Sequence, residues 1–180
     1  MAKSIGLNVP VTPDSHEAGI TEPVKRFFSP MVVDIRPVDD PQWGNSKNYY
    51  FYQNAHGQVI FCLTPDPSIV GINRQETSSF LPQVTKRMIN LLPRLKNLKV
   101  RRTWRGLYPM TPDGSPIVGP IRDIEGYINA VGMCGQGYMI GPGLGEVLAR
   151  FIADEPTKED EIILNEFSLY RDFGSVEKLK

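Results

Sequence analysis

The stretch that decides the fold is rich in glycine and reads Gly132-Met133-Cys134-Gly135-Gln136-Gly137-Tyr138-Met139-Ile140-Gly141-Pro142-Gly143-Leu144-Gly145. It holds six of the protein's 16 glycines. Glycine costs conformational entropy, so it is favoured where the backbone takes a positive φ or lies close against another group. A packed core does not need such a concentration of glycine. The stretch therefore indicates a turn built around close backbone contacts.

The flanks of this stretch predict the elements that it joins. Residues 127–131 have the composition of a short strand. Gly141 as N-cap and Pro142 at the first helical position suit the start of a helix. Apolar residues then recur with the spacing of one helix face, at Leu144, Val147, Leu148, Phe151 and Ile152. The helix N-terminus, with its free N–H groups and positive dipole end, suits an anionic or electron-rich ligand.

Two other interpretations compete with a ligand site. In the first, the glycines only permit close packing at a strand-to-helix crossover. In the second, Gly135-x-Gly137-x-x-x-Gly141 is a loose variant of the dinucleotide fingerprint, with Glu166 at a tolerable distance for its acidic residue. No second strand–helix series follows, so we do not expect a self-contained dinucleotide fold. Six glycines ahead of one helix favour a ligand.

Composition places the 180 residues among ordinary globular chains, with 41% hydrophobic and 22% charged residues. The formal net charge is zero, which gives no electrostatic case for nucleic acid or an anionic membrane. No apolar run approaches the roughly 18 residues of a membrane span, and the N-terminus lacks a signal-peptide core. Two cysteines, Cys62 and Cys134, make no disulfide framework, so we expect a cytoplasmic protein.

The region after residue 30 predicts an α+β fold with a mostly antiparallel sheet. The expected strands are residues 31–37, 48–53, 58–63 and 98–104, with short extended segments at 115–119 and 162–164. Asn54-Ala55-His56-Gly57 predicts a hairpin turn. A helix at about 79–92 should pack on the sheet through Phe80, Val84 and Met88. Thr111-Pro112-Asp113-Gly114 is a type I turn signal.

The usual catalytic constellations are absent from the sequence. No pattern of Cys, His and carboxylates has metal-ligand spacing, and His16 and His56 read as loop or surface residues. In the aromatic strand, Tyr50 and Tyr52 share one face. That face is either packed sheet surface or an aromatic wall over a ligand, with phenol hydroxyls as hydrogen-bonding groups. Because the sequence has few candidate acid–base residues and a glycine-rich turn suited to a ligand, we expect a cofactor to carry the reaction.

A longer pattern identifies the family that this chain resembles. It comprises Arg101-Arg102-Thr103-Trp104-Arg105-Gly106-Leu107-Tyr108-Pro109-Met110-Thr111-Pro112-Asp113-Gly114-Ser115-Pro116-Ile117-Val118-Gly119, followed by the glycine stretch. This pattern resembles the D-amino-acid oxidase family of FAD-dependent flavoproteins. Within the family, the likeness is to the branch of sarcosine oxidase beta subunit, glycine oxidase and dimethylglycine dehydrogenase.

The resemblance also implies a domain organisation. The family begins with a Rossmann unit that grips the FAD pyrophosphate, and no such unit is present in these 180 residues. By this likeness, residues 1–29 are a crossing segment from the FAD domain, 30–105 the substrate-binding domain and 106–174 the return to the FAD domain. Residues 175–180 would be a frayed tail. Either the chain is part of a longer enzyme, or a second chain supplies the Rossmann half.

The resemblance assigns roles to individual residues. Non-covalent FAD would contact the turn at Gly135, Gln136, Gly137, Tyr138 and Met139, with backbone N–H groups facing N1 and O2 of the reduced flavin. Hydride would pass from the substrate's α-carbon to flavin N5. Tyr108 would bind the substrate together with Tyr50 and Tyr52. Gly106 replaces a cysteine that bonds flavin in monomeric sarcosine oxidase, and Met139 replaces a lysine used there with oxygen. Dehydrogenase behaviour is therefore expected.

Three hypotheses of different classes follow for the function. The first is part of an FAD-dependent oxidoreductase acting on a secondary amine or amino acid that is sarcosine-, glycine- or proline-like. The second is a non-catalytic ligand-binding module that uses the same sheet. The third is an inactive fragment that lacks the Rossmann half. In the first case Tyr108 and Met139 would be the catalytic residues.

Overall fold

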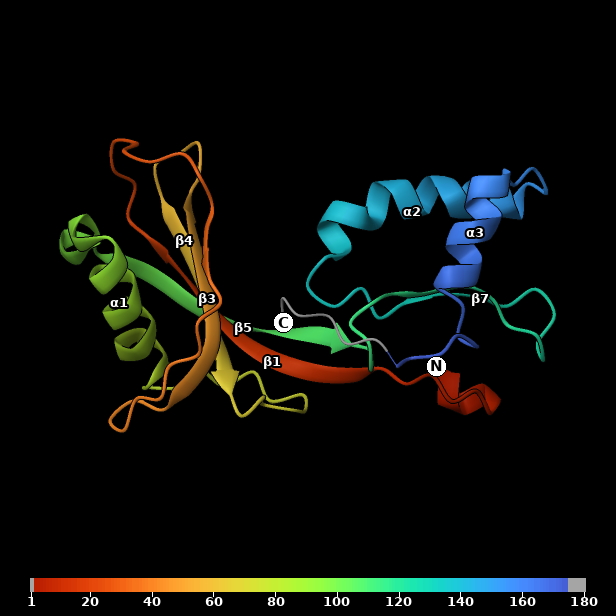
Figure 1. Ribbon diagram of the computed structural model, residues 1–180, viewed down its shortest axis with the longest axis horizontal. Helices are drawn as coiled ribbons and strands as arrows, with labels where there is room; N and C mark the ends of the chain where they lie inside the picture. Colours follow the sequence, from red (N-terminus) through yellow and green to blue (C-terminus); the bar gives the residue numbers. More distant parts are fainter. Residues whose placement is uncertain (1, 175–180) are drawn as a thin grey trace. The chain divides into compact units, whose positions relative to one another are not determined.

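The computed structural model describes residues 2–174, and its chain divides into two compact units. The sheet unit comprises residues 14–107. The glycine-turn unit comprises residues 2–13 and 108–174 (Figure 1). Each unit has a hydrophobic core of its own.

A five-stranded sheet forms the sheet unit, in the order β2-β3-β4-β1-β5. The strands are β1 (Thr12–Thr21), β2 (Val32–Asp34), β3 (Asn45–Gln53), β4 (Val59–Asp66) and β5 (Val100–Met110). The registered pairs β1–β4, β2–β3 and β3–β4 are all antiparallel. The α+β class with a mostly antiparallel sheet is confirmed.

The predicted hairpin of β3 and β4 lies at the middle of this sheet. Its register pairs Tyr50 with Cys62 and Phe51 with Phe61. The Gly57 amide donates to the Asn54 carbonyl and closes the turn. Gly57 has φ +83, and a Cβ there would overlap the Val24 carbonyl, so both backbone angle and space require glycine. Residues Asn54 to Gly57 therefore set the register, as the sequence predicted.

Helix α1 (Phe80–Leu91) covers one face of the sheet and is followed by the 3-10 turn η2 (Pro93–Asn97). Its Phe80, Val84 and Met88 are buried in one core with aromatic residues of β3 and β4, as predicted. The core members from the strands are Tyr49, Phe51, Val59, Phe61 and Leu63. Because side chains alternate along a strand, this packing leaves Tyr50 and Tyr52 on the opposite face.

Strand β1 is a finding that the sequence did not predict. No strand was expected in residues 1–29, the crossing segment, yet Thr12–Thr21 pairs with β4 from Glu17↔Leu63 to Ile20↔Ile60. Pro13 and the polar run after it hide the alternation. The strand is buried by its neighbours rather than by its own apolar content. Strand β2 is also shorter than the predicted 31–37, because the Asp34 side chain accepts from the Arg36 amide just beyond it.

The glycine-turn unit contains a two-stranded antiparallel sheet and two helices. Its elements are η1 (Ala2–Ile5), β6 (Ile117–Pro120), β7 (Ile128–Val131), α2 (Gly137–Ile152) and α3 (Lys158–Glu166). Val118 of β6 shares a buried cluster with Leu144 and Val147 of α2 and Leu164 of α3. The predicted strand–turn–helix order around the glycine stretch is therefore present.

One predicted helix boundary and one predicted burial in this unit were wrong. Helix α2 begins at Gly137 with Gln136 as N-cap, not at Gly141, so Pro142 lies inside the helix. Ile152, placed by its spacing on the packed helix face, is instead largely exposed.

Residues 162–164, expected as a strand, belong to α3. Thr157 and Asp160 form a capping box there: the Asp160 amide donates to Thr157 Oγ1, and the Thr157 amide donates to Asp160 Oδ2. The predicted frayed tail lies outside the described residues. Among the described helices, none is long and apolar enough to cross a membrane.

Candidate functional site

The glycine turn follows β7, and its backbone at Gly132 leaves no room for a side chain. Gly132 has φ +69, and a Cβ there would overlap the methyl group of Thr111. Cys134 follows with φ +52, a conformation uncommon for residues other than glycine. The Cys134 amide donates to the Pro109 carbonyl. The turn is thus held against the end of β5 and the segment after it.

Tyr108 lies directly against the glycine turn. A Cβ at Gly135 would meet the Tyr108 ring at 3.0 Å, so the ring packs on the backbone of the turn. The structure therefore brings together Tyr108 and Gly135, two of the residues assigned to the site by resemblance. Both belong to the glycine-turn unit, so the contact is internal to it.

The N-terminus of α2 has neither a side-chain cap nor an acidic residue in its first turn. Its first residues Gly137 and Tyr138 present amide groups that helix geometry leaves without helical acceptors. The Met139 amide bends back to the Gln136 carbonyl. Tyr138 is 98% exposed and Met139 74% exposed. The turn therefore offers unshielded N–H groups at the positive end of a 16-residue helix.

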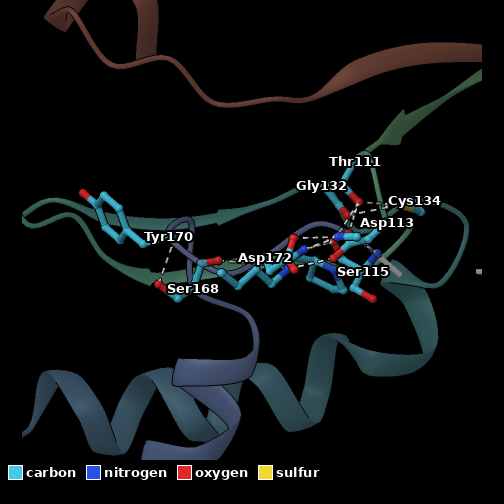
Figure 2. A network of polar contacts seen from close by, with 11 residues as sticks. Thr111, Asp113, Ser115, Gly132, Cys134, Ser168, Tyr170 and Asp172 are labelled. Atoms are coloured by element: carbon cyan, nitrogen blue, oxygen red, sulfur yellow. Dashed lines mark hydrogen bonds and ion pairs between the residues drawn. The ribbon is translucent and has the colours of Figure 1, made fainter. Parts of the chain in front are cut away.

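A network of polar contacts lies behind the turn (Figure 2). Thr111 Oγ1 lies 3.1 Å from Asp113 Oδ1 and 3.7 Å from Cys134 Sγ, and it donates to the Ser115 carbonyl. Arg171 binds Asp113 in bidentate fashion, with Nε–Oδ2 2.7 Å and Nη2–Oδ1 2.9 Å. The same guanidinium also donates to the carbonyls of Pro116 and Ser168. The segment after α3 is thereby fixed to the turn before β6.

Electrostatics favour the ionised form of Asp113. Burial raises the pKa of this carboxyl, but hydrogen bonds from Arg171, Ser115 and Thr111 outweigh it and lower the pKa from 3.8 to about 2. The Thr-Pro-Asp-Gly signal predicted the turn. It did not reveal that its aspartate binds Arg171, because the two residues are 58 positions apart.

Tyr50 and Tyr52 belong to the sheet unit, separate from the compact unit of Tyr108 and the glycine turn. They share the sheet face opposite α1, half-buried, as their alternation predicted. His56 is exposed at the hairpin tip, as expected. His16, expected in a loop, is instead a buried residue of β1, with Nε2 3.3 Å from Asp14 Oδ2. No sequence pattern indicated this pair, because β1 itself was not predicted.

Comparison with known proteins shows the family of the chain. The profile of the family described as "DAO: FAD dependent oxidoreductase" matches residues 1–151. The chain belongs to this family of FAD-dependent oxidoreductases.

Curated relatives agree with the branch inferred from sequence. Over 150 residues, the chain is 25% identical to hydrogen cyanide synthase subunit HcnC of Pseudomonas aeruginosa, covering 83% of this chain and 33% of that one. It is 31% identical to glycine oxidase of Bacillus subtilis (62% and 30% covered). It is 23% identical to sarcosine oxidase subunit beta of Rhodobacter capsulatus (95% and 37% covered). The chain thus spans about a third of the length of these relatives.

Among solved structures, L-proline dehydrogenase from P. horikoshii superposes with a TM-score of 0.77 at 32% identity. The match covers 97% of this chain and 44% of that one. The family and its fold are therefore shown for nearly the whole length of the chain.

The residues of the glycine turn fit the flavin that the family uses. A Cβ at Gly135 or Gly137 would lie at 3.0 Å from Tyr108 or Met133, so glycine at both positions lets these side chains pack closely on the turn. The uncapped amides of α2 are hydrogen-bond donors suited to an electron-rich ring edge. These features hold one edge of a cofactor. The pyrophosphate cradle of a Rossmann unit is not among the described elements.

Proposed function

We propose that this chain forms the substrate-binding and flavin-edge part of an FAD-dependent oxidoreductase that oxidises a small secondary amine or amino acid. The observation that carries the proposal is the uncapped N-terminus of α2 behind a glycine turn on which Tyr108 packs. Glycine oxidase, a sarcosine oxidase subunit and L-proline dehydrogenase among the similar proteins support this class of substrate.

In this proposal, the backbone of the glycine turn supports the flavin edge. The amides of Gly137 and Tyr138 donate to electron-rich atoms of the ring, and the α2 dipole favours negative charge there. Glycine at 135 and 137 allows the backbone to approach the ring. The flavin, when bound, supplies the acceptor for the hydride of the substrate. Its binding is non-covalent at Gly106, which offers no side chain for a bond.

Tyr108 and the sheet unit supply the substrate contacts in this proposal. The Tyr108 phenol donates one hydrogen bond to the substrate carboxylate, a weaker contact than the bidentate pair that arginine makes. Tyr50 and Tyr52 form an aromatic wall on the open face of the sheet. Met139 places no cation beside the turn, so reduced enzyme passes electrons to an acceptor other than oxygen. Met139 and Tyr108 are thus the proposed catalytic residues.

The proposed holoenzyme also needs a Rossmann-type half for the FAD pyrophosphate. That half would be supplied by additional sequence of the same protein or by a second chain. The names of two relatives describe them as subunits, which supports a multi-chain assembly. A cytoplasmic location is proposed because the sequence holds only two cysteines, too few for a disulfide framework.

The test is anaerobic reduction of the flavin in the completed holoenzyme. Glycine, sarcosine and L-proline are added separately, and bleaching of the visible flavin spectrum is followed by stopped flow. We expect at least one of these amines to reduce the flavin. A folded, FAD-loaded holoenzyme that none of them reduces, nor any other small amine, would remove the proposed activity. A ligand-binding module would then be left.

A further inference from the structure

The open face of the sheet changes from apolar to polar along its strands. Register places Ile20, Ile60 and Tyr52 in one row across β1, β4 and β3. Ala18, Cys62 and Tyr50 form the next row. Asn48 and Thr64 pair in the third row, where Thr64 Oγ1 donates to Asn48 Oδ1 at 2.8 Å. The antiparallel register adds His16 to this third row, and Asp14 follows it on the same face.

Asp14 carries an unmet hydrogen-bond acceptor at the polar end of this face. Its side chain is 14% exposed, and Oδ2 receives the contact from His16 Nε2 at 3.3 Å. Its other oxygen, Oδ1, is fully buried and has no hydrogen-bond partner among the described residues. A buried carboxylate oxygen without a donor is unfavourable, because it has lost its hydrogen bonds to water and gained none in return. Such an atom in a native protein requires an explanation, and a ligand that brings a hydrogen-bond donor is one.

His16 does not neutralise this carboxylate. Burial lowers the pKa of the imidazole, and Lys47 and Arg105 lower it further, while Asp14 acts in the opposite direction with a smaller total effect. His16 is therefore neutral at neutral pH, only 8% exposed, and its Nε2–H orients the carboxylate. Asp14 lies on the same face of β1 as His16, two residues nearer the start of the strand.

We propose that Asp14, held in place by His16, binds the protonated amine of the substrate through Oδ1. An ammonium group offers both the missing N–H donor and the opposite charge. This inference rests on the proposed amine-oxidising function and adds a specificity residue to it. Asp14 would select substrates that carry a cationic nitrogen.

The test compares ligands that differ only at the nitrogen. L-proline is paired with tetrahydro-2-furoate and sarcosine with methoxyacetate, each ether oxygen replacing the N–H group. Binding to the anaerobic FAD-loaded holoenzyme is measured through perturbation of the flavin spectrum, with rapid mixing for ligands that also reduce the flavin. The variant is Asp14→Asn, with Asp39→Asn at an exposed site of the same unit as the matched control.

We expect Asp14→Asn to weaken binding of the amine ligand by about tenfold or more, the size of a lost hydrogen bond to a charged group. Binding of the ether analogue should change by less than about twofold on the same scale, because it never had the N–H donor. Asp39→Asn should change neither. His16→Gln should give a smaller loss, again confined to the amine, because Asp14 keeps its charge but loses its orientation.

Equal weakening of both ligand types by Asp14→Asn would overturn the inference, since it would indicate only a structural role. Unchanged binding of both types would overturn it as well. If the variant does not fold, Asp14→Ser provides the same comparison with a smaller side chain. If amines reduce the wild-type holoenzyme but the variants bind amine and ether ligands with the same relative change, only this inference is contradicted. If no amine reduces the wild-type holoenzyme, both the proposed function and this inference are contradicted.

Discussion

The ion pair of Arg171 and Asp113 should be the main polar contact that holds the glycine-turn unit together. The two side chains are 10% and 3% exposed and share two short hydrogen bonds. Removing one partner of a buried pair leaves the other charge without compensation, at a cost of about 3–5 kcal/mol. Asp113→Asn should fall near the lower end, about 3 kcal/mol, since Arg171 keeps carbonyl acceptors at Pro116 and Ser168.

The loss should be local and should depend on pH. Because the pKa of Asp113 is lowered from 3.8 to about 2 in the folded protein, its contribution is present above about pH 4 and disappears as the pH falls towards 2. That contribution amounts to about 2 kcal/mol. Wild type and Asp113→Asn should therefore become more similar in stability as the solution is acidified through this range.

Hydrogen exchange read by mass spectrometry separates the two units. Peptides from β6 and the segment around Arg171 should exchange faster in Asp113→Asn, while those from β3 and β4 should not. Both tryptophans, Trp43 and Trp104, lie in the sheet unit, so their fluorescence in urea provides an internal reference. The exposed Asp123→Asn is the matched control. A loss below about 1 kcal/mol, or equal loosening of both units, would refute the assigned role of the pair.

Three further changes test other parts of the structure. Thr157→Ala removes the capping box of α3 and should cost about 1 kcal/mol, seen as faster exchange of the α3 amides; unchanged exchange would contradict the cap. In the completed holoenzyme, Tyr108→Phe should lower kcat/KM for a carboxylate-bearing amine by roughly 10- to 100-fold, the value of one hydrogen bond to a charged group; an unaltered kcat/KM would remove Tyr108 from the site. Met139→Lys should speed reoxidation of the reduced flavin by oxygen in stopped flow, because it places a cation near developing negative charge; a rate already oxidase-like in wild type, or no gain in the variant, would contradict the place given to Met139.

Local sequence patterns predicted the elements that depend on local interactions. The alternation of β3 and the Asn54–Gly57 turn gave the hairpin, and the spacing of Phe80, Val84 and Met88 gave α1. Strand β1 was not predicted, because its burial comes from β4 beside it and not from an apolar pattern of its own. The Ile-Ile-Leu run of α3 resembled a strand, while the cap at Thr157 was the stronger signal.

The candidate site could be predicted only in part, for a physical reason. The glycine concentration marked the turn, and the family pattern marked Tyr108, but the packing of Tyr108 on Gly135 depends on how β5 meets the turn. Likewise, Asp113 and Arg171 come together across 58 positions. The lack of a hydrogen-bond partner at Asp14 Oδ1 can be recognised only once β1 is placed in the sheet. Contacts of this kind follow from tertiary structure and leave no periodic signal.

We propose that this chain supplies one edge of a flavin site whose pyrophosphate cradle lies in a Rossmann-type half. The most direct measurement is the FAD content of purified protein, with this chain alone compared with this chain joined to the N-terminal part of the P. horikoshii L-proline dehydrogenase fold. We expect this chain by itself to be colourless, and the completed fold to carry about one FAD per chain. Stoichiometric FAD on these 180 residues alone, or a folded completed protein without FAD, would contradict it.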